Sequence, residues 1–214
     1  LDIGCGNGFS TIRLAKAFPQ PRFLGGDCAE NMIKQARLAL RKSNMSRRNL
    51  RFRIMDVTKL SKFGQKFDVI ISDRCLINLP ILSSQRSAVQ EIHAALRKGG
   101  HYIMVENFIE GHRGMNQARR GIALPEIPVR WHNTFFNENF VGYLNNFFTI
   151  KHRENISSLY YLLTRVVYSK ICRLEKREPD YDNPLYKIAT KIGEAIGDYG
   201  PVKLLVLTKK DQVL

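Results

Sequence analysis

Long apolar runs, paired cysteines and an initiator methionine are all missing from this sequence of 214 residues. A membrane-spanning helix needs about 18 or more apolar residues in a row, and no stretch reaches that length. No signal peptide leads the chain. The four cysteines show no C-x-x-C spacing, so neither a disulfide framework nor a metal site is predicted. These absences predict a cytoplasmic protein, and a chain that begins inside a strand predicts that its natural start precedes Leu1.

Acidic residues are also scarce, with 19 against 34 basic ones and a net charge of +15. The imbalance is strongest between residues 34 and 53, where no acid interrupts a run of cations. These cations are Lys34, Arg37, Arg41, Lys42, Arg47, Arg48, Arg51 and Arg53. Such a field attracts nucleic acid, anionic lipid or anionic glycan, whereas the alternative is a solvated helix face that runs into a loop. At 44% hydrophobic residues, the length fits one α/β domain with insertions.

The opening stretch LDIGCGNGFST predicts the end of a buried strand, a glycine-rich turn and a helix that starts at Ser10 or Thr11. Glycines allow a sharp turn and let a ligand lie against the backbone. A dinucleotide fingerprint needs G-x-G-x-x-G, but Phe9 stands at the third glycine position, and a phosphate loop needs Gly-Lys-Ser/Thr. The carboxylate Asp2 precedes the turn. The alternative is an ordinary tight strand–helix turn.

LDIGCGNG resembles the first motif of the class I S-adenosylmethionine-dependent methyltransferases. The resemblance implies a Rossmann-like α/β fold, a mostly parallel seven-stranded sheet flanked by helices. It also implies S-adenosylmethionine as cofactor, with its amino-acid end held by Asp2, Gly4, Gly6 and Gly8. We expect one domain over residues 1–214, made of a cofactor-binding core (1–107), an acceptor lid (108–136) and a helical insertion (156–198).

Two further strands end on carboxylates. RFLGGD is a short buried strand ending at Asp27, which faces the ligand crevice and accepts the ribose hydroxyls; capping of the next helix is the alternative role. LRFRIMD alternates apolar and basic residues and ends at Asp56. By resemblance, Asp56 accepts a hydrogen bond from the adenine amino group and Val57 supplies a backbone amide. GGDCAENMIKQAR also resembles the family, which places Cys28 and Met32 at the cofactor, although helical periodicity equally makes Met32 a core residue.

The strand FDVIIS leads into DRCLINLP, which corresponds to the family's fourth motif, between cofactor and acceptor. Asp73 is predicted to border the cofactor and Arg74 to grip an acidic acceptor. Base amino-methylation typically uses Asn/Asp-Pro-Pro-Tyr/Phe here, and carbon-5 methylation of cytosine uses Pro-Cys. Neither motif is present, so Cys75 is not predicted to be a nucleophile.

The rest of the chain is expected to alternate helices and strands. Ser83 or Ser84 caps a helix that Gly99-Gly100 stops. Strands are predicted at 101–107, 148–155 and 203–209, and helices at 138–147, 157–172 and from Pro184 onward, with Asn183 as cap. Between 108 and 137 regular periodicity is lost, and a connection that long is expected to be functional.

The acceptor chemistry is assigned to this lid and to the end of the fifth strand. His132 is the predicted base, because the pKa of histidine, near 6.5, suits proton removal; bonding within the lid is its alternative role, and His112 is the reserve. Glu106 is a second catalytic candidate and Asn107 a substrate ligand, since both follow the strand into the crevice. Arg130 and Trp131 complete the predicted acceptor site.

The sequence therefore predicts methyl transfer from S-adenosylmethionine to an oxygen or nitrogen of a small-molecule acceptor. A sugar or glycan precursor is the finer hypothesis, from a faint likeness of SDRCLINLP and RWHN to bacterial methyltransferases of that kind. The alternatives are an RNA methyltransferase that uses the basic residues 34–53, and a cofactor-binding accessory protein without activity. No transmembrane segment is expected, nucleic acid is a possible but not a favoured partner, and no oligomeric state is predicted.

Overall fold

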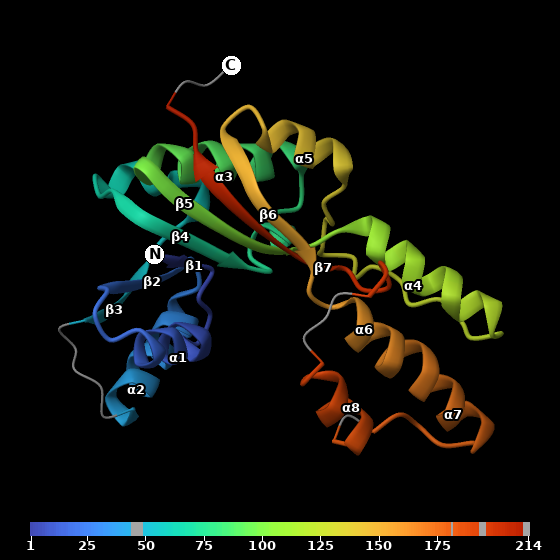
Figure 1. Cartoon of the computed structure of the whole chain (residues 1–214). Coiled ribbons are helices and arrows are strands. Elements are labelled where there is room, and N and C mark those ends of the chain that lie inside the picture. The colour runs from blue at the N-terminus through green and yellow to red at the C-terminus, as the bar shows by residue number, and fades with distance from the viewer. Residues whose placement is uncertain (44–48, 181, 193–195, 212–214) are drawn as a thin grey trace.

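The structure, a computed structural model, describes residues 1–43, 49–180, 182–192 and 196–211. Within them seven strands form one sheet in the order β3-β2-β1-β4-β5-β7-β6 (Figure 1). The strands are β1 (Asp2–Ile3), β2 (Phe23–Asp27), β3 (Leu50–Ile54), β4 (Phe67–Asp73), β5 (Leu96–Asn107), β6 (Phe148–Asn155) and β7 (Val202–Lys209). Strands β1 to β5 are parallel, while β7 runs antiparallel to both β5 and β6. The predicted fold class is confirmed.

Helices cover both faces of this sheet (Figure 1). They are α1 (Phe9–Ala17), α2 (Glu30–Lys42), α3 (Leu82–Ala95), α4 (Ile109–Gly121), α5 (Glu138–Leu144), α6 (Ser158–Tyr161), α7 (Tyr168–Leu174) and α8 (Pro184–Ala189). Two short 3₁₀ segments, η1 (Val57–Phe63) and η2 (Leu76–Asn78), follow β3 and β4, and a π-helix, η3 (Leu162–Val167), joins α6 to α7. Helices α1 and α2 pack on one core cluster with β3, and α3 and α5 on a larger one.

The strand order reverses at β1, which pairs with β2 on one side and β4 on the other. In open parallel sheets a ligand crevice forms beyond the carboxyl ends of the strands at such a switch point. The glycine turn after β1 and the ends of β2, β3 and β4 therefore meet at one place. The fold brings the predicted cofactor motifs together there.

The segment after β5 corrects the prediction of lost periodicity, because α4 occupies most of its first half. The buried face of α4 carries polar side chains, including His112, Asn116 and Arg119, so it lacks an apolar stripe in the sequence. Gly111 and Gly114 also lie on this helix, and a Cβ on Gly114 would meet the Asp198 carbonyl oxygen. The helix packs through polar contacts and bare backbone, which a hydrophobic pattern does not reveal.

Other boundaries are confirmed or corrected. Strand β6 begins and ends as predicted, and Asn183 caps α8 by accepting a hydrogen bond from Tyr186 N at 3.2 Å. The helix predicted at 157–172 is present as α6, η3 and α7 in succession. The prediction for α3 is wrong at both ends: neither Ser83 nor Ser84 caps it, and it stops at Ala95, directly before β5 starts at Leu96. Two cations of the predicted basic run, Arg47 and Arg48, lie outside the described residues.

Helices α4, α6, α7 and α8 and the π-helix η3 form a helical arm that projects from one end of the sheet (Figure 1). Side chains tie its parts together: Lys170 Nζ donates to the Ile122 carbonyl oxygen at 2.8 Å, and Arg119 donates to the Arg165 carbonyl oxygen. None of the described helices has both the length and the apolar character needed to span a membrane.

Candidate functional site

The turn after β1 has the backbone conformation that its glycines predict. Gly4, Gly6 and Gly8 have φ angles of 77°, 53° and 78°, the left-handed region that other residues avoid. A Cβ on Gly4 would lie 2.5 Å from both Cβ and Sγ of Cys75. The turn is fixed to β2, since Gly4 N and Cys5 N donate to the Gly26 carbonyl oxygen at 2.7 and 3.0 Å.

Asp27 joins this turn to the start of α2. Its Oδ2 accepts a hydrogen bond from Gly6 N at 2.9 Å, and its Oδ1 accepts one from Ala29 N at 2.8 Å. The two roles weighed for this residue are compatible, because a carboxylate offers about four lone-pair sites and these bonds use two. The side chain is half-buried and lines a cleft, so its remaining lone pairs are available to hydroxyl donors there.

Asp56 holds the equivalent position after β3. Its Oδ1 accepts hydrogen bonds from Thr58 N at 2.9 Å and Thr58 Oγ1 at 2.7 Å, and Lys59 Nζ lies 3.5 Å from its Oδ2. Burial on its own raises the pKa of Asp56, but these hydrogen bonds and the lysine charge outweigh it and lower the pKa. Asp56 is therefore ionised at neutral pH, and its neighbour Val57 is buried.

These residues line one cavity, which we name the strand-end cleft. It has a volume of about 220 Å³. Its walls are Ile3, Gly4, Asp27, Cys28, Met55, Asp56, Val57, Arg74, Cys75, Asn78 and Leu79. The structure thus brings together six of the residues predicted for the site: Gly4, Asp27, Cys28, Asp56, Val57 and Arg74.

Five predicted cofactor residues lie outside this lining: Gly6 and Gly8 of the glycine turn, and Asp2, Met32 and Asp73. Asp2 is buried, and its Oδ2 accepts a hydrogen bond from Thr11 Oγ1 at 2.5 Å, which ties β1 to α1. Burial raises the pKa of Asp2. Asp73 pairs with the neighbouring Arg74, with 3.1 Å between Oδ1 and Nε. Met32 is 39% exposed, so the core role for it is wrong: α2 turns Ile33, Ala36 and Leu40 inward instead.

Arg74 occupies an unusual backbone position at the rim of the cleft. Its φ of 50° is in the left-handed region, which costs a non-glycine residue about 1–2 kcal/mol. Two hydrogen bonds hold it there, from Arg74 N to the Val105 carbonyl oxygen and from Asn78 Nδ2 to the Arg74 carbonyl oxygen, both at 2.8 Å. Strain of this kind persists where the surrounding structure fixes it, often at functional sites.

The expectation that Glu106 faces the crevice is wrong, because its side chain is fully buried beneath the loop after β4. Its Oε1 accepts hydrogen bonds from Ser72 Oγ at 2.9 Å, Cys75 N at 3.1 Å and Leu76 N at 3.0 Å. Burial raises the pKa of Glu106 to about 7, against the opposing effect of these hydrogen bonds. The carboxyl group positions the loop that carries Arg74 and Cys75 and has no surface to offer an acceptor.

Replacement of Glu106 by glutamine tests this positioning role through the pH dependence of stability. A carboxyl whose pKa is higher in the folded chain stabilises the fold at low pH and loses that contribution as pH rises through about 7. A rise from 4.5 to about 7 corresponds to about 3 kcal/mol. The melting temperature of the wild type is expected to fall from pH 5 to pH 8 relative to that of Glu106→Gln. Parallel profiles would refute the assignment.

The predicted base and its neighbours sit on an exposed turn. Trp131 is 94% exposed, and its ring meets that of His132 edge-on, with centroids 5.3 Å apart. The turn docks next to the strand-end cleft, since Asn133 Nδ2 donates to Asn78 Oδ1 at 2.8 Å. His132 is exposed, as is Arg130, and neither lines the cleft.

His112, the reserve base, and Asn107, the predicted substrate ligand, are more deeply buried than His132. His112 is buried in α4 with its ring edge-on to Phe135, and burial lowers its pKa, so it is neutral near pH 7. Asn107 ends β5, and within the described part of the chain its Oδ1 is buried without a hydrogen-bond partner. A buried acceptor of this kind normally has a partner.

A second, larger cavity was not predicted at all. It measures about 630 Å³ and lies between the β6–α6 junction, η3 and α8, and we name it the arm cleft. Its walls are Arg74, Glu154, Asn155, Ile156, Ser157, Ser158, Leu159, Tyr160, Tyr161, Arg165, Ala189, Thr190, Ile192 and Val202. These walls come from segments far apart in the sequence, so no local motif predicts them. The adjacent Tyr160 and Tyr161 are the sequence feature that could have pointed to this cavity.

Comparisons with known proteins agree with this geometry. Residues 1–137 match the family described as a methyltransferase domain. A malonyl-[acyl-carrier protein] O-methyltransferase of Bacillus cereus is 34% identical over 73 residues, 34% of this chain and 25% of that protein. A trans-aconitate 2-methyltransferase of Variovorax paradoxus is 31% identical over 100 residues, 47% of this chain and 35% of that protein. The structure of magnesium protoporphyrin IX methyltransferase from Synechocystis PCC 6803 with bound S-adenosylhomocysteine has a TM-score of 0.61 at 16% identity, covering 98% of this chain and 73% of that one.

The strand order, the glycine turn and the carboxylates at the ends of β2 and β3 define a Rossmann-like domain of the class I methyltransferase type, whose cofactor is S-adenosylmethionine. The chain belongs to the family of methyltransferase domains. It spans only 25% and 35% of the lengths of the two curated relatives described above.

Proposed function

We propose that this domain transfers the methyl group of S-adenosylmethionine to an oxygen or nitrogen of a small molecule. The observation that carries the proposal is the strand-end cleft, where Asp27 and Asp56 lie in one lining with the glycine turn. The bound cofactor would supply an electrophilic methyl group on a sulfonium. The chain holds donor and acceptor in the orientation that the transfer needs, and this orientation is the larger part of such catalysis.

The side chains in and beside the cleft fit this nucleoside. The half-buried Asp27 has unused lone pairs and would accept hydrogen bonds from the ribose hydroxyls. The ionised Asp56 would accept a hydrogen bond from the adenine amino group, and the backbone amide of Val57 lies beside it. Gly6, where a Cβ would meet nothing within 4 Å, leaves open backbone for the amino-acid end, while Gly4 and Gly8 let the turn pack closely against Cys75 and Phe52. Asp2 braces the turn through its hydrogen bond with Thr11. Cys28, Met32 and Asp73 would border the cofactor.

For the acceptor we propose Arg74, Asn107, Arg130 and Trp131 as ligands. The curated relatives include proteins named for acidic acceptors, a malonyl group and trans-aconitate, which agrees with an arginine at the junction of two clefts. A sugar or glycan precursor remains the finer hypothesis from the sequence. The two are compatible where the sugar precursor carries an acidic group.

His132 is the proposed base, and its replacement tests the proposal. Loss of a general base typically slows a reaction about 10²- to 10⁴-fold. His132→Gln is expected to lower kcat at least 100-fold at pH 7 and to leave the affinity for S-adenosylhomocysteine within twofold, since His132 does not line the strand-end cleft. Rate measurements with the labelled acceptor across pH 5–9 check this. An unchanged kcat would assign His132 to the structure of the turn.

Methyl labelling identifies the acceptor class. The protein is incubated with radiolabelled methyl donor and a fractionated cell extract, and label is expected in small metabolites. Label in RNA, with binding that falls steeply with salt, would instead favour the basic residues 34–53 as a docking surface. Of these, Arg37 already donates to the Phe52 carbonyl oxygen and Lys34 pairs with Glu30. Donor binding without label in any fraction would favour an inactive accessory protein.

A further inference from the structure

The arm cleft has the size, position and chemistry of an acceptor site. We propose that it binds a small molecule with an anionic group, a carboxylate or a phosphate, on an apolar or ring-shaped body. Its volume of about 630 Å³ is in the range of small-molecule sites, about 300–1,000 Å³. The methylation of that molecule rests on the function proposed above, but its binding can be tested separately.

The position of the cleft follows from Arg74, which lines both cavities. Hydrogen bonds with Val105 and Asn78 fix the strained backbone of Arg74, so its side chain extends from a defined position at the boundary between the two clefts. A molecule in the arm cleft that reaches Arg74 therefore lies next to the strand-end cleft. That arrangement is what transfer between two bound molecules requires.

The charge of the cleft favours an anion. Two guanidinium groups line it, those of Arg74 and Arg165, against one carboxylate, Glu154. His152 Nε2 lies 3.1 Å from Glu154 Oε2, and Arg74 Nε lies 3.1 Å from Asp73 Oδ1, so one carboxylate and one guanidinium of the lining each already have a partner. Arginine binds carboxylates and phosphates through paired hydrogen bonds, and the net charge of +15 attracts anions over longer distances.

The remaining walls suit an apolar or ring-shaped body. Ile156 and Ile192 are 48% and 43% exposed and supply apolar surface to the cleft. The rings of Tyr160 and Tyr161 meet edge-on with centroids 5.8 Å apart, which offers aromatic surface beside the charged groups.

The π-helix η3 in the wall of the arm cleft is a second, independent observation that favours a binding site there. Arg165 lies in η3, and π-helical turns are rare and often found at functional sites. The backbone there is secured from α4, because the buried Arg119 donates to the Arg165 carbonyl oxygen and, at 2.7 Å, to the Pro125 carbonyl oxygen. The guanidinium of Arg165 lies 6.0 Å from the centre of the Tyr186 ring.

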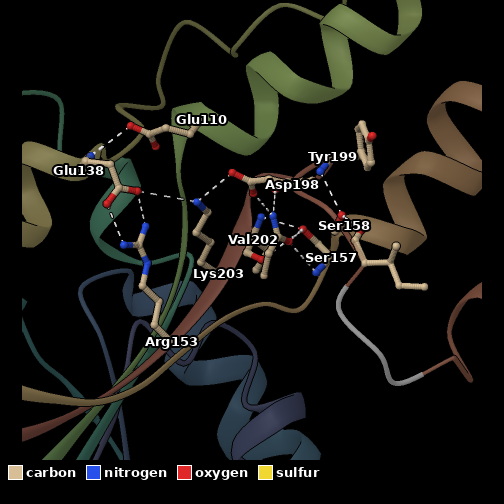
Figure 2. A network of polar contacts seen from close by, with 12 residues as sticks. Glu110, Glu138, Arg153, Ser157, Ser158, Asp198, Tyr199, Val202 and Lys203 are labelled. Atoms are coloured by element: carbon tan, nitrogen blue, oxygen red, sulfur yellow. Dashed lines mark hydrogen bonds and ion pairs between the residues drawn. The ribbon is translucent and has the colours of Figure 1, made fainter.

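A polar network fixes the floor of the cleft to the sheet (Figure 2). Ser157 Oγ accepts a hydrogen bond from Val202 N at 2.8 Å, and Ser157 N donates to Asn155 Oδ1 at 3.0 Å. Behind them the buried Lys203 Nζ lies 3.2 Å from Asp198 Oδ2 and 3.9 Å from Glu138 Oε1. The cleft is therefore built in advance of binding, which reduces the ordering cost that a ligand pays.

Three fluorescent probes with one shared ring system test the proposal: 2-naphthyl phosphate, 2-naphthoate and the neutral 2-naphthamide. Fluorescence titration of the wild type is expected to show at least one anionic probe binding 10-fold or more tightly than the amide. Preference for the phosphate or for the carboxylate distinguishes the two sources of charge. Equal binding of all three probes would overturn the proposal.

Substitutions of the two lining arginines show whether they cause the preference for an anionic probe. Arg165→Gln and, independently, Arg74→Gln are expected to reduce it to less than threefold, whereas Arg165→Lys retains part of it. The matched control is Arg173→Gln, an exposed arginine of α7 outside the cleft lining, which is expected to bind like the wild type. Full anion preference in both Arg165→Gln and Arg74→Gln would refute the assignment.

Calorimetry with S-adenosylhomocysteine separates this inference from the proposed function. Arg165→Gln, Arg165→Lys and Arg173→Gln are expected to bind it within threefold of the wild type, which also shows that they are folded. Arg74 also lines the strand-end cleft, so the folding of Arg74→Gln is checked by its melting temperature instead. Heat from S-adenosylhomocysteine without any anion preference among the probes overturns the acceptor site alone. Anion preference without heat from S-adenosylhomocysteine supports the arm cleft and contradicts the donor site instead.

Discussion

Gly4→Ala is expected to abolish binding of S-adenosylhomocysteine and to lower the free energy of unfolding by about 3 kcal/mol. The added Cβ would lie 2.5 Å from Cβ and Sγ of Cys75. Rotation of the cysteine side chain cannot relieve the contact with its Cβ, so the backbone of one loop must shift, and overpacking costs about 1–3 kcal/mol. The left-handed φ of 77° adds about 1–2 kcal/mol.

The matched control is Gly64→Ala, which separates the steric clash from the backbone strain. Gly64 has a φ of 59°, but a Cβ there would meet nothing within 4 Å. Its cost is expected to stay near 1 kcal/mol, with donor binding unchanged. Adding Cys75→Gly to Gly4→Ala should recover part of the stability, because the atoms at 2.5 Å are removed. Urea unfolding and calorimetry measure both effects, and a loss no larger in Gly4→Ala than in Gly64→Ala would contradict the account.

Asp27→Asn is expected to weaken binding of S-adenosylhomocysteine about 100-fold, because hydrogen bonds to a charged group contribute about 1.5–3 kcal/mol each. The amide keeps the shape of the side chain but has one acceptor oxygen in place of two. It cannot accept from Gly6 N, Ala29 N and two ribose hydroxyls together. Stability is expected to fall by about 1–2 kcal/mol, since one of the two backbone amides loses its acceptor.

Asp68→Asn is the control for this change. Asp68 is an exposed aspartate whose Oδ1 lies 2.8 Å from Arg97 Nη1 on the surface. Its replacement is expected to leave donor affinity within twofold. If Asp27→Asn binds S-adenosylhomocysteine as tightly as Asp68→Asn does, the carboxylate has no part in holding the ribose and the proposed orientation of the nucleoside is wrong.

The sheet and the strand-end cleft could be predicted from the sequence because their signals are local. The period of two at residues 50–54 and the apolar run at 67–72 each indicate a strand, and the glycines after β1 indicate a tight turn. Asp27 and Asp56 follow directly from strand ends, and the parallel order of those strands brings them to one edge.

What the sequence did not predict depends on contacts between distant segments. Glu106 looks like a crevice residue by its place at the end of β5, but backbone amides from the loop after β4 surround it. The buried face of helix α4 carries polar residues, so hydrophobic periodicity does not reveal it. The arm cleft joins walls from residues 74, 154–161, 165, 189, 190, 192 and 202, and only the folded chain assembles them.

A crystal structure of this chain with S-adenosylhomocysteine tests the central claim most directly. We expect the ribose hydroxyls within hydrogen-bond distance of Asp27, the adenine beside Asp56 and Val57, and the amino-acid end over the turn at Gly4 and Gly6. A nucleoside bound anywhere else on the chain, or one whose ribose contacts neither carboxylate, would contradict that claim.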